Sequence, residues 1–215
     1  MNNEINLKNT EDLILKGEYL PIMEEFYSLQ GEGFNTGKAA YFIRIGGCDV
    51  GCHFCDVKEA WDASLLSPTP IDEVIERANS YPAKSVIITG GEPLLYNLDL
   101  LCQKLKEKGI ETILETSGSS KISGVWDWIC LSAKRNLPPL EENMKFASEL
   151  KMIICDEDDF LFAEQYAKKV EKTCKLYLQC EWSVSNTMTP LIVDYIKANP
   201  KWRISLQSHK YIRIP

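Results

Sequence analysis

Short apolar segments alternate with amphipathic ones along most of the chain. The apolar segments are rich in β-branched and aromatic residues and predict buried strands over 41–45, 85–89, 111–116, 126–132, 151–155, 175–179 and 202–207. Between them, apolar residues recur at three- and four-residue spacing and predict helices over 70–80, 98–109, 158–173 and 189–200. Gly109 and Pro200 suit the ends of two of these helices.

Strands that alternate with helices predict an α/β fold with a mainly parallel sheet. The chain has 215 residues, enough for one large domain with its own core, and no low-complexity linker divides it. We therefore expect a single domain over residues 1–215. In parallel α/β folds the active residues gather at the carboxyl ends of the strands, so motifs at these ends are the first candidates for a site.

Composition and charge exclude several classes of protein. Hydrophobic residues make up 45% of the chain and charged residues 26%, as is usual for a globular protein. The net charge of -7 argues against a general nucleic-acid binder, which would show a basic patch. No apolar run is long enough to span a bilayer, and the polar, acidic N-terminus lacks the order of a signal peptide. We expect a cytoplasmic protein with neither a nucleic-acid nor a membrane partner.

The chain has 8 cysteines, which divide into two groups. Those in or beside apolar stretches are expected to be buried, reduced thiols; they are Cys102, Cys130, Cys155, Cys174 and Cys180. Cys48, Cys52 and Cys55 instead crowd into "GGCDVGCHFCD" (46–56) and need another explanation.

Thiolates are ligands of zinc and of iron–sulfur clusters. A structural zinc site usually takes four ligands in two separated pairs, and this trio has no second pair nearby. His53 stands between Cys52 and Cys55 and would strain a tetrahedral site. A cubane iron–sulfur cluster normally takes four cysteines, so three leave one iron open, which indicates chemistry rather than structure alone.

The spacing Cys-x3-Cys-x2-Cys, with the aromatic Phe54 before the last cysteine, resembles the signature of the radical S-adenosylmethionine (SAM) superfamily. This resemblance implies a 4Fe–4S cluster on the three cysteines, with SAM chelated at the open iron and cleaved to a 5′-deoxyadenosyl radical. A second motif, "SVIITGGEPLL" (85–95), would on its own be a strand-to-helix turn. After such a cysteine loop it resembles the superfamily's glycine-rich segment, whose backbone binds the amino group of SAM.

Three further strands end in polar residues. These residues are either ordinary polar residues of surface loops or residues that contact the cosubstrate. They are "LETSG" (114–118), "LSAK" (131–134) and "LQCEW" (178–182), which supply Glu115, Thr116, Ser117, Ser132, Lys134, Gln179 and Glu181.

Segments across the chain resemble the 7-carboxy-7-deazaguanine synthase family from about residue 20 onward, which would make residues 1–20 a variable extension. They are "SLQGEG" (28–33), the strand with Arg44, "CDVKEAWD" (55–62), "LSAK" and "QSHKYIRIP" (207–215). The resemblance implies a partial, open (β/α) barrel of the radical SAM type with a minimal core. It also implies conversion of 6-carboxy-5,6,7,8-tetrahydropterin to 7-carboxy-7-deazaguanine with loss of ammonia, for queuosine and other 7-deazapurines. The resemblance further implies a homodimer and a reducing partner such as flavodoxin.

The family's roles carry over residue by residue. The resemblance assigns substrate contacts to Leu29, Gln30, Gly31, Arg44, Thr89 and Pro215, and SAM contacts to Phe54, Gly91, Ser132, Ala133, Lys134, Gln179, Cys180, Glu181 and Trp182. A guanidinium at Arg44 can pair with a substrate carboxylate through two parallel hydrogen bonds, although a lone strand arginine more often forms a surface ion pair. The terminal carboxylate of Pro215 offers two acceptors that match the donor pair on the pyrimidine edge of a pterin. His209 receives no catalytic role.

One position departs from the family pattern. The family commonly binds magnesium through a threonine two positions after the last cysteine, and here that position is Val57. Valine has no side-chain oxygen, whereas magnesium requires oxygen ligands. If magnesium binds as the resemblance implies, the adjacent Asp56 or water has to take the place of the threonine.

Two other functions share parts of this pattern. A radical SAM activase that installs a glycyl radical on a partner protein has the same cysteine loop and strand layout. A non-catalytic iron–sulfur electron carrier would not need the open iron.

Overall fold

The structure is a computed structural model that describes residues 7–215, with side chains from residue 10 onward. Its strands are β1 (Tyr19–Leu20), β2 (Ile22–Leu29), β3 (Ala39–Ile45), β4 (Thr69–Pro70), β5 (Ser85–Gly90), β6 (Glu111–Thr116), β7 (Trp128–Leu131), β8 (Glu149–Ile154), β9 (Lys175–Cys180) and β10 (Trp202–Ser205). Its α-helices are α1 (Leu7–Leu15), α2 (Ile71–Asn79), α3 (Asp99–Glu107), α4 (Asp158–Ala167), α5 (Ser185–Ala198) and α6 (Ser208–Ile212). Short 3-10 segments are η1 (Lys58–Trp61), η2 (Ala63–Leu65), η3 (Pro93–Leu95), η4 (Glu141–Phe146) and η5 (Trp182–Val184).

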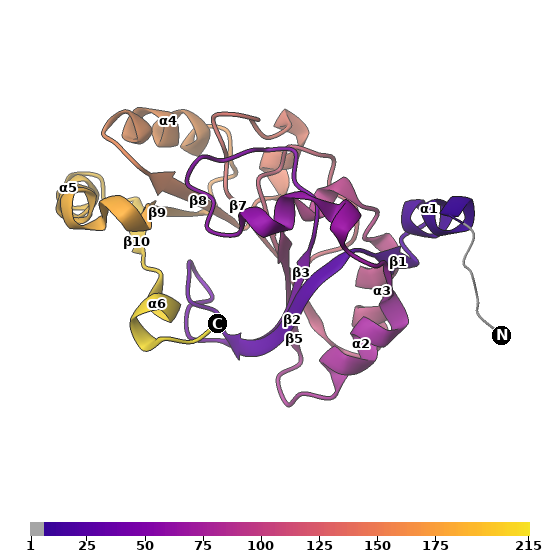
Figure 1. The fold of residues 1–215 in the computed structure, drawn as a ribbon. Helices are drawn as coiled ribbons and strands as arrows, with labels where there is room; N and C mark the ends of the chain where they lie inside the picture. Colours follow the sequence, from indigo (N-terminus) through magenta and orange to yellow (C-terminus); the bar gives the residue numbers. More distant parts are fainter. Residues whose placement is uncertain (1–6) are drawn as a thin grey trace.

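One 8-stranded sheet dominates the structure, in the order β10-β9-β8-β7-β6-β5-β3-β2. From β3 to β10 each strand runs parallel to the next, while β2 pairs antiparallel with β3 at one edge. Because the strand order follows the chain without reversal, right-handed crossovers place the helices on one face, and the sheet curls around the other (Figure 1). The described strands β2 and β10 remain edges, which confirms the expected open, partial (β/α) barrel.

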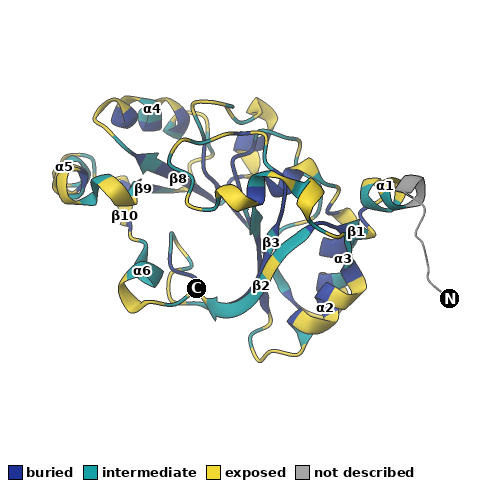
Figure 2. Ribbon diagram, in the orientation of Figure 1, coloured by how far each residue is buried: buried dark blue, intermediate teal, exposed yellow. Residues whose placement is uncertain are grey.

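The convex outer face of the sheet carries the apolar core. Tyr41, Ile43 and Ile45 of β3 pack in one buried cluster with residues of α2 and α3. Leu150 and Met152 of β8 belong to a second buried cluster with residues of α4 and α5. Figure 2 shows the buried residues of these helices on the side toward the sheet and exposed ones away from it. The period-2 alternation of strands therefore places the intervening residues on the concave face.

The concave inner face changes character along the strands. Near their amino ends Ala40, Phe42, Ile87 and Ile113 form a small buried apolar cluster. Further along the strands most inward positions are polar, and they are Arg44, Thr89, Glu115, Lys151 and Gln179, with the apolar Ile153 among them on β8. The polar half of this face lies where the sequence places its motifs.

Several elements differ from the sequence-based expectations. β7 begins at Trp128 rather than 126, because the carboxylate of Asp127 turns to accept a hydrogen bond from the backbone N–H of Thr112 at 2.9 Å. α4 ends at Ala167, and residues 168–173 return the chain to β9. α5 begins at Ser185 and so contains Pro190. Among the described residues, no helix is both long enough and apolar enough to cross a membrane.

Candidate active site

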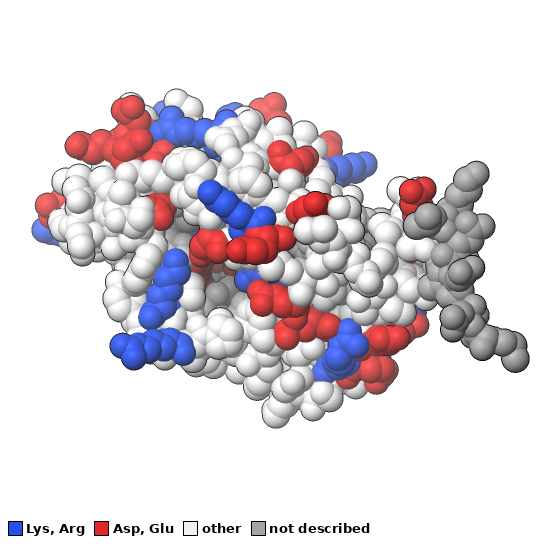
Figure 3. All heavy atoms as spheres, in the orientation of Figure 1, with Lys and Arg blue, Asp and Glu red and all other residues white. Residues whose placement is uncertain are grey.

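The carboxyl ends of the strands surround a cavity of about 360 Å³ on the inner face, a volume suited to small ligands. Figure 3 shows a hollow on this face, with basic side chains on one side and acidic side chains on the other. The cavity is lined by most residues singled out from the sequence: Leu29, Gln30, Gly31, Arg44, Cys48, Cys52, Phe54, Cys55, Asp56, Val57, Thr89, Gly91, Ser132, Lys134, Gln179, Cys180, Glu181, Trp182 and Pro215. Ala133 is the exception, because its side chain is 4% exposed and packs in the second outer cluster.

The cysteine trio follows β3 and lines this cavity in the reduced, half-buried form. Burial raises the pKa of the Cys48 and Cys52 thiols, so a metal bound there has to supply the charge that stabilises the thiolates. In residues 10–215 no three His, Cys, Asp or Glu side chains converge on a point for one metal ion. The thiolates of a cubane cluster bind separate irons and need no such point. The three free thiols line one cavity, which is the arrangement that a shared cluster requires.

Three glycines shape the cysteine loop and its contact with the segment after β5. Gly47 has a φ of 99° and Gly51 a φ of 64°, a region that favours glycine. The loop is joined to the segment after β5, because the N–H of Glu92 donates to the carbonyl of Gly47 at 2.8 Å. A Cβ on Gly91 would lie 2.1 Å from that carbonyl oxygen, so only glycine permits the contact. The two sequence motifs thus meet through their backbones.

Glu92 is a site residue whose side chain the sequence reasoning missed, although it stands within the quoted glycine-rich motif. It is 1% exposed. Its carboxylate accepts hydrogen bonds from the hydroxyls of Thr116 and Ser117, both at 2.5 Å, and from the N–H of Ser117 at 2.8 Å. The carboxylate therefore ties the end of β6 to the segment that contacts the cysteine loop.

The residues assigned to SAM lie along one wall of the cavity. The ammonium of Lys134 donates to the hydroxyl of Ser132 at 2.6 Å and lies 5.6 Å from the ring centre of Phe54. Burial lowers the pKa of Lys134. Gln179 accepts a hydrogen bond from the hydroxyl of Ser205 at 2.6 Å. These contacts connect β7, the cysteine loop, β9 and β10 around one space.

Glu181 and Trp182 come from the turn after β9. The carboxylate of Glu181 accepts hydrogen bonds from the N–H of Ser183 at 3.0 and 3.1 Å, which fixes the start of η5. Trp182 is 41% exposed, and its ring meets that of Tyr211 edge-on with the centroids 5.4 Å apart. The wall therefore continues to α6.

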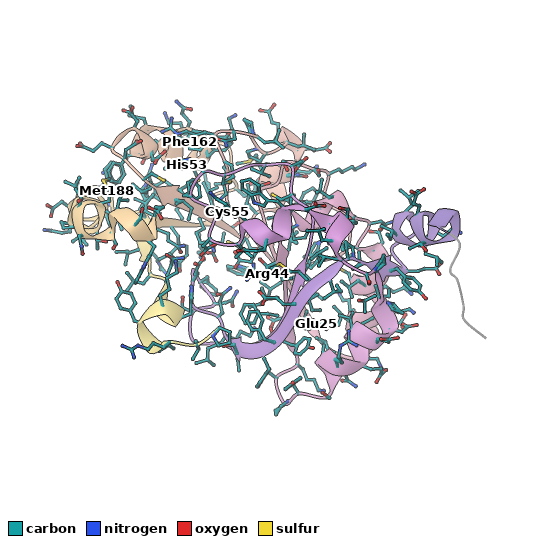
Figure 4. The ribbon with its side chains drawn as sticks, in the orientation of Figure 1. Glu25, Arg44, His53, Cys55, Phe162 and Met188 are labelled. Carbon is teal, nitrogen blue, oxygen red and sulfur yellow. The ribbon has the colours of Figure 1, made fainter. Side chains whose placement is uncertain are left out.

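The residues assigned to substrate lie around the remaining sides. Arg44 stands beside Thr89 in the sheet register, and its Nε donates to Glu24 at 2.6 Å. This ion pair agrees with the ordinary role of a strand arginine, while the terminal guanidinium nitrogens can still donate to a ligand. A terminal carboxylate oxygen of Pro215 accepts from the Ser28 hydroxyl at 3.2 Å, which places the chain end against β2 (Figure 1). Figure 4 shows Arg44 near the centre of the molecule.

The sequence analysis singled out Glu115 but not Lys151, which joins it to Glu32 in a buried group of charges on the inner face. The ammonium of Lys151 lies 2.6 Å from Glu32 and 2.8 Å from Glu115. Despite burial, the Lys151 ammonium and the hydrogen bonds to Glu32 lower the pKa of that carboxyl to about 2. The sequence signal for Lys151 was a charge at the start of an apolar strand, since lysine is almost never buried without partners.

The position that the family commonly uses for magnesium lies in the cavity wall. Asp56 and Val57 both line the cavity, and the Asp56 carboxylate lies 3.5 Å from the ammonium of Lys210. Val57 supplies no side-chain oxygen. His209 also lines the cavity, next to Gly31, and burial lowers its pKa.

Comparisons with known proteins agree with this geometry. The Radical SAM superfamily profile matches residues 42–137, which include the cysteine loop and the glycine-rich motif. The chain is 55% identical to the 7-carboxy-7-deazaguanine synthase of Flavobacterium psychrophilum, over 97% of this chain and 99% of the relative. It is 44% identical to the synthase of the same name from Synechocystis, over 90% of this chain and 93% of the relative.

The fold agrees as well. The crystal structure of QueE from Escherichia coli matches with a TM-score of 0.79 at 30% identity, covering 93% of this chain and 99% of that one. This match confirms the radical SAM type of open barrel. Identities of this size over nearly whole chains on both sides show common family membership, and the chain belongs to the 7-carboxy-7-deazaguanine synthase family of the radical SAM superfamily.

Proposed function

We propose that the protein converts 6-carboxy-5,6,7,8-tetrahydropterin to 7-carboxy-7-deazaguanine with loss of ammonia, in the biosynthesis of queuosine and other 7-deazapurines. The observation that carries this proposal is the 55% identity to a synthase of that name over almost the full length of both chains. The cavity supports it, because the cysteine trio, Arg44 and the chain terminus line the same space.

As a radical SAM enzyme the protein uses a 4Fe–4S cluster and SAM. When bound, these groups supply the radical that removes the hydrogen at C6 of the pterin. The chain's own contribution is to hold them: Cys48, Cys52 and Cys55 would bind the cluster, and the backbone at Gly91 would contact the amino group of SAM. The Lys134 ammonium, held by Ser132 at 2.6 Å, would face the cosubstrate from the segment after β7.

The same cavity offers complementary groups to the pterin. The guanidinium of Arg44 would pair with the substrate carboxylate by two charge-assisted hydrogen bonds. The terminal carboxylate of Pro215 would accept from the ring N–H and the exocyclic amine. Leu29, Gln30 and Gly31 would close the remaining side, with Thr89 beside Arg44. Magnesium would bind near Asp56, with water in place of the side-chain oxygen that Val57 lacks.

Assembly and partners complete the proposal. We infer a cytoplasmic homodimer that receives electrons from a reducing partner such as flavodoxin. We also infer a single domain with residues 1–20 as a variable extension, of which residues 1–6 lie outside the described part of the chain. Within this extension the described residues form α1 and β1, and β1 pairs with β4.

The deciding experiment is anaerobic reconstitution of the cluster, followed by incubation with SAM, a reductant and carboxytetrahydropterin. We expect 7-carboxy-7-deazaguanine and ammonia in equal amounts. SAM cleavage without pterin turnover would instead favour the glycyl-radical activase, and absence of SAM cleavage would favour an electron carrier. The Cys48→Ala variant is the matched control and should give no product.

A further inference from the structure

Lys151 stands at the centre of a hydrogen-bonded group that joins separate segments beneath the cavity. It lies on the inner face of β8, with a side chain that is 5% exposed. Its ammonium donates to Glu32, from the loop between β2 and β3, at 2.6 Å and to Glu115 of β6 at 2.8 Å. The other oxygens of these carboxylates accept from Gln207 at 3.0 Å and from Gln30 at 2.9 Å, respectively.

Both carboxylates and the lysine line the cavity. One buried ammonium is thus paired with two carboxylates. This triad of Lys151, Glu32 and Glu115 has one more negative than positive charge, and it borders the ligand space. An ionised carboxylate has only acceptor oxygens, so this charge suits a ligand that presents N–H donors. A buried carboxylate without a cation would instead take up a proton and lose part of this capacity.

None of the other ionisable groups around the triad supplies a second positive charge to the two carboxylates. They are Glu149 on the same strand, Cys130 of β7, Lys134 after β7 and His209 of α6. Burial raises the pKa of the Cys130 thiol well above its ordinary value, and burial lowers the pKa of His209, so both are neutral near neutral pH. Lys134 donates to Ser132 instead.

We propose that Lys151 is a positioning residue for the pterin site, whose ammonium holds the carboxylates of Glu32 and Glu115 in place, and that of Glu32 charged, as acceptors for N–H groups of the bound heterocycle. The inference rests on the proposed function. Lys151 acts through the two carboxylates and has no assigned contact with the substrate.

The test uses the reconstituted holoenzyme in three forms besides the wild type: Lys151→Met, Lys151→Arg and the control Lys201→Met. Lys201 pairs with Glu164 at 2.6 Å on the outer side of the molecule, away from the cavity lining. Turnover of carboxytetrahydropterin is measured from mildly acidic to mildly alkaline pH, giving kcat and KM separately. Infrared spectra of the same samples report the band of protonated carboxylic acids.

We expect Lys151→Met to raise KM by about tenfold or more, the consequence of losing a charge-assisted contact, with a smaller change in kcat. The rise should grow as pH falls through neutrality, because Glu32 loses the cation that kept its carboxylate ionised. A new carboxylic-acid band should appear over the same range. Lys151→Arg retains the charge and should keep the wild-type pH profile, as should Lys201→Met.

The proposal is overturned if Lys151→Met keeps the wild-type pH profile and shows no new band, or if Lys151→Arg shifts the profile as much as methionine does. If Lys151→Met does not fold, the double variant Lys151→Met/Glu115→Gln removes one charge of each sign and is judged by the same criterion on Glu32. A wild-type enzyme that makes no product contradicts the proposed function, whereas turnover without any Lys151 effect contradicts this inference alone.

Discussion

The two faces of the sheet show how one strand can carry both stability and chemistry. On β8, Leu150 is fully buried among apolar residues of the outer face, while its neighbour Lys151 points to the inner face between two carboxylates. The outer face needs only apolar volume, which the helices supply. The inner face buries charge, and each charge there requires a partner from another segment. Sequence alternation decides which face a residue serves.

The cysteines give the sharpest contrast between the two regions. Cys48→Ala should abolish the iron–sulfur absorbance and all turnover, because the thiolate is a direct ligand of the cluster. Cys102 is 1% exposed in the outer core, so Cys102→Ala should retain cluster and turnover. Visible absorbance and product formation after anaerobic reconstitution check both. Loss of the cluster in Cys102→Ala with retention in Cys48→Ala would reverse the assignment.

Leu150→Ala tests the outer face alone. Removing this fully buried side chain should lower the free energy of unfolding by about 2–5 kcal/mol, since it leaves a cavity in the second cluster. The KM for the pterin should remain close to that of the wild type at a temperature where the variant is folded. Denaturant unfolding and steady-state kinetics on one preparation make the measurement. A large change in KM with unchanged stability would contradict the division between the faces.

The sequence predicted the outer face better than the inner one. Period-2 strands and amphipathic helices report which residues are apolar, and every expected strand is present, β6 with identical limits. The sequence analysis did not predict β2, because the acidic Glu24 and Glu25 interrupt its apolar pattern. The strand tolerates both residues because it lies at the edge of the sheet. The role of Lys151 depends on the register of β8 against β6 and on a loop far away in the chain, neither of which local patterns specify.

The candidate site was predictable to the extent that it follows motifs. The cysteine trio and the glycine-rich segment are local, and parallel topology brings strand ends together, so their common cavity could be foreseen. The hydrogen bonds of Glu92 to the end of β6 depend on how two strands are paired, and no spacing encodes that. His209 contacts the loop at Gly31 through a tertiary fold that the sequence does not reveal.

Glu32→Gln should show how much the ionised Glu32 carboxylate contributes to the free energy of unfolding. Since the folded pKa of Glu32 is lowered from 4.5 to about 2, its ionised form stabilises the fold above pH 4.5, and this contribution disappears as pH falls toward 2. The shift corresponds to on the order of 3 kcal/mol. The variant should therefore lose less stability over this range than the wild type.

Unfolding curves at several acidic pH values measure this difference. Glu76→Gln is a suitable control, because Glu76 pairs with Lys108 on the exposed outer side, where ion pairs contribute little. Parallel pH profiles for wild type and Glu32→Gln would show that the buried ion pair does not stabilise the fold.

A C-terminal tag should affect the inner face without affecting the outer one. Blocking the terminal carboxylate of Pro215 should weaken pterin binding by about 1–3 kcal/mol, while fold, cluster and uncoupled SAM cleavage persist. An N-terminally tagged protein is the control. Equal pterin affinity for both tagged forms would remove the terminus from the site.

Val57→Thr should have the smallest effect. If Asp56 and water already assemble a magnesium site, an added hydroxyl should strengthen the response of turnover to magnesium by less than about tenfold, the equivalent of one neutral hydrogen bond. Titration of magnesium into chelator-treated enzyme measures this response. Full activity in chelator for both proteins would show that the reaction proceeds without the ion.

The most direct test of the whole account is an anaerobic crystal structure of the reconstituted protein with SAM and carboxytetrahydropterin. The cluster should be bound by Cys48, Cys52 and Cys55, and the pterin should lie on the concave face within hydrogen-bond distance of Arg44 and the Pro215 carboxylate. A pterin bound on the helix-covered face, or a cluster held by other cysteines, would contradict it.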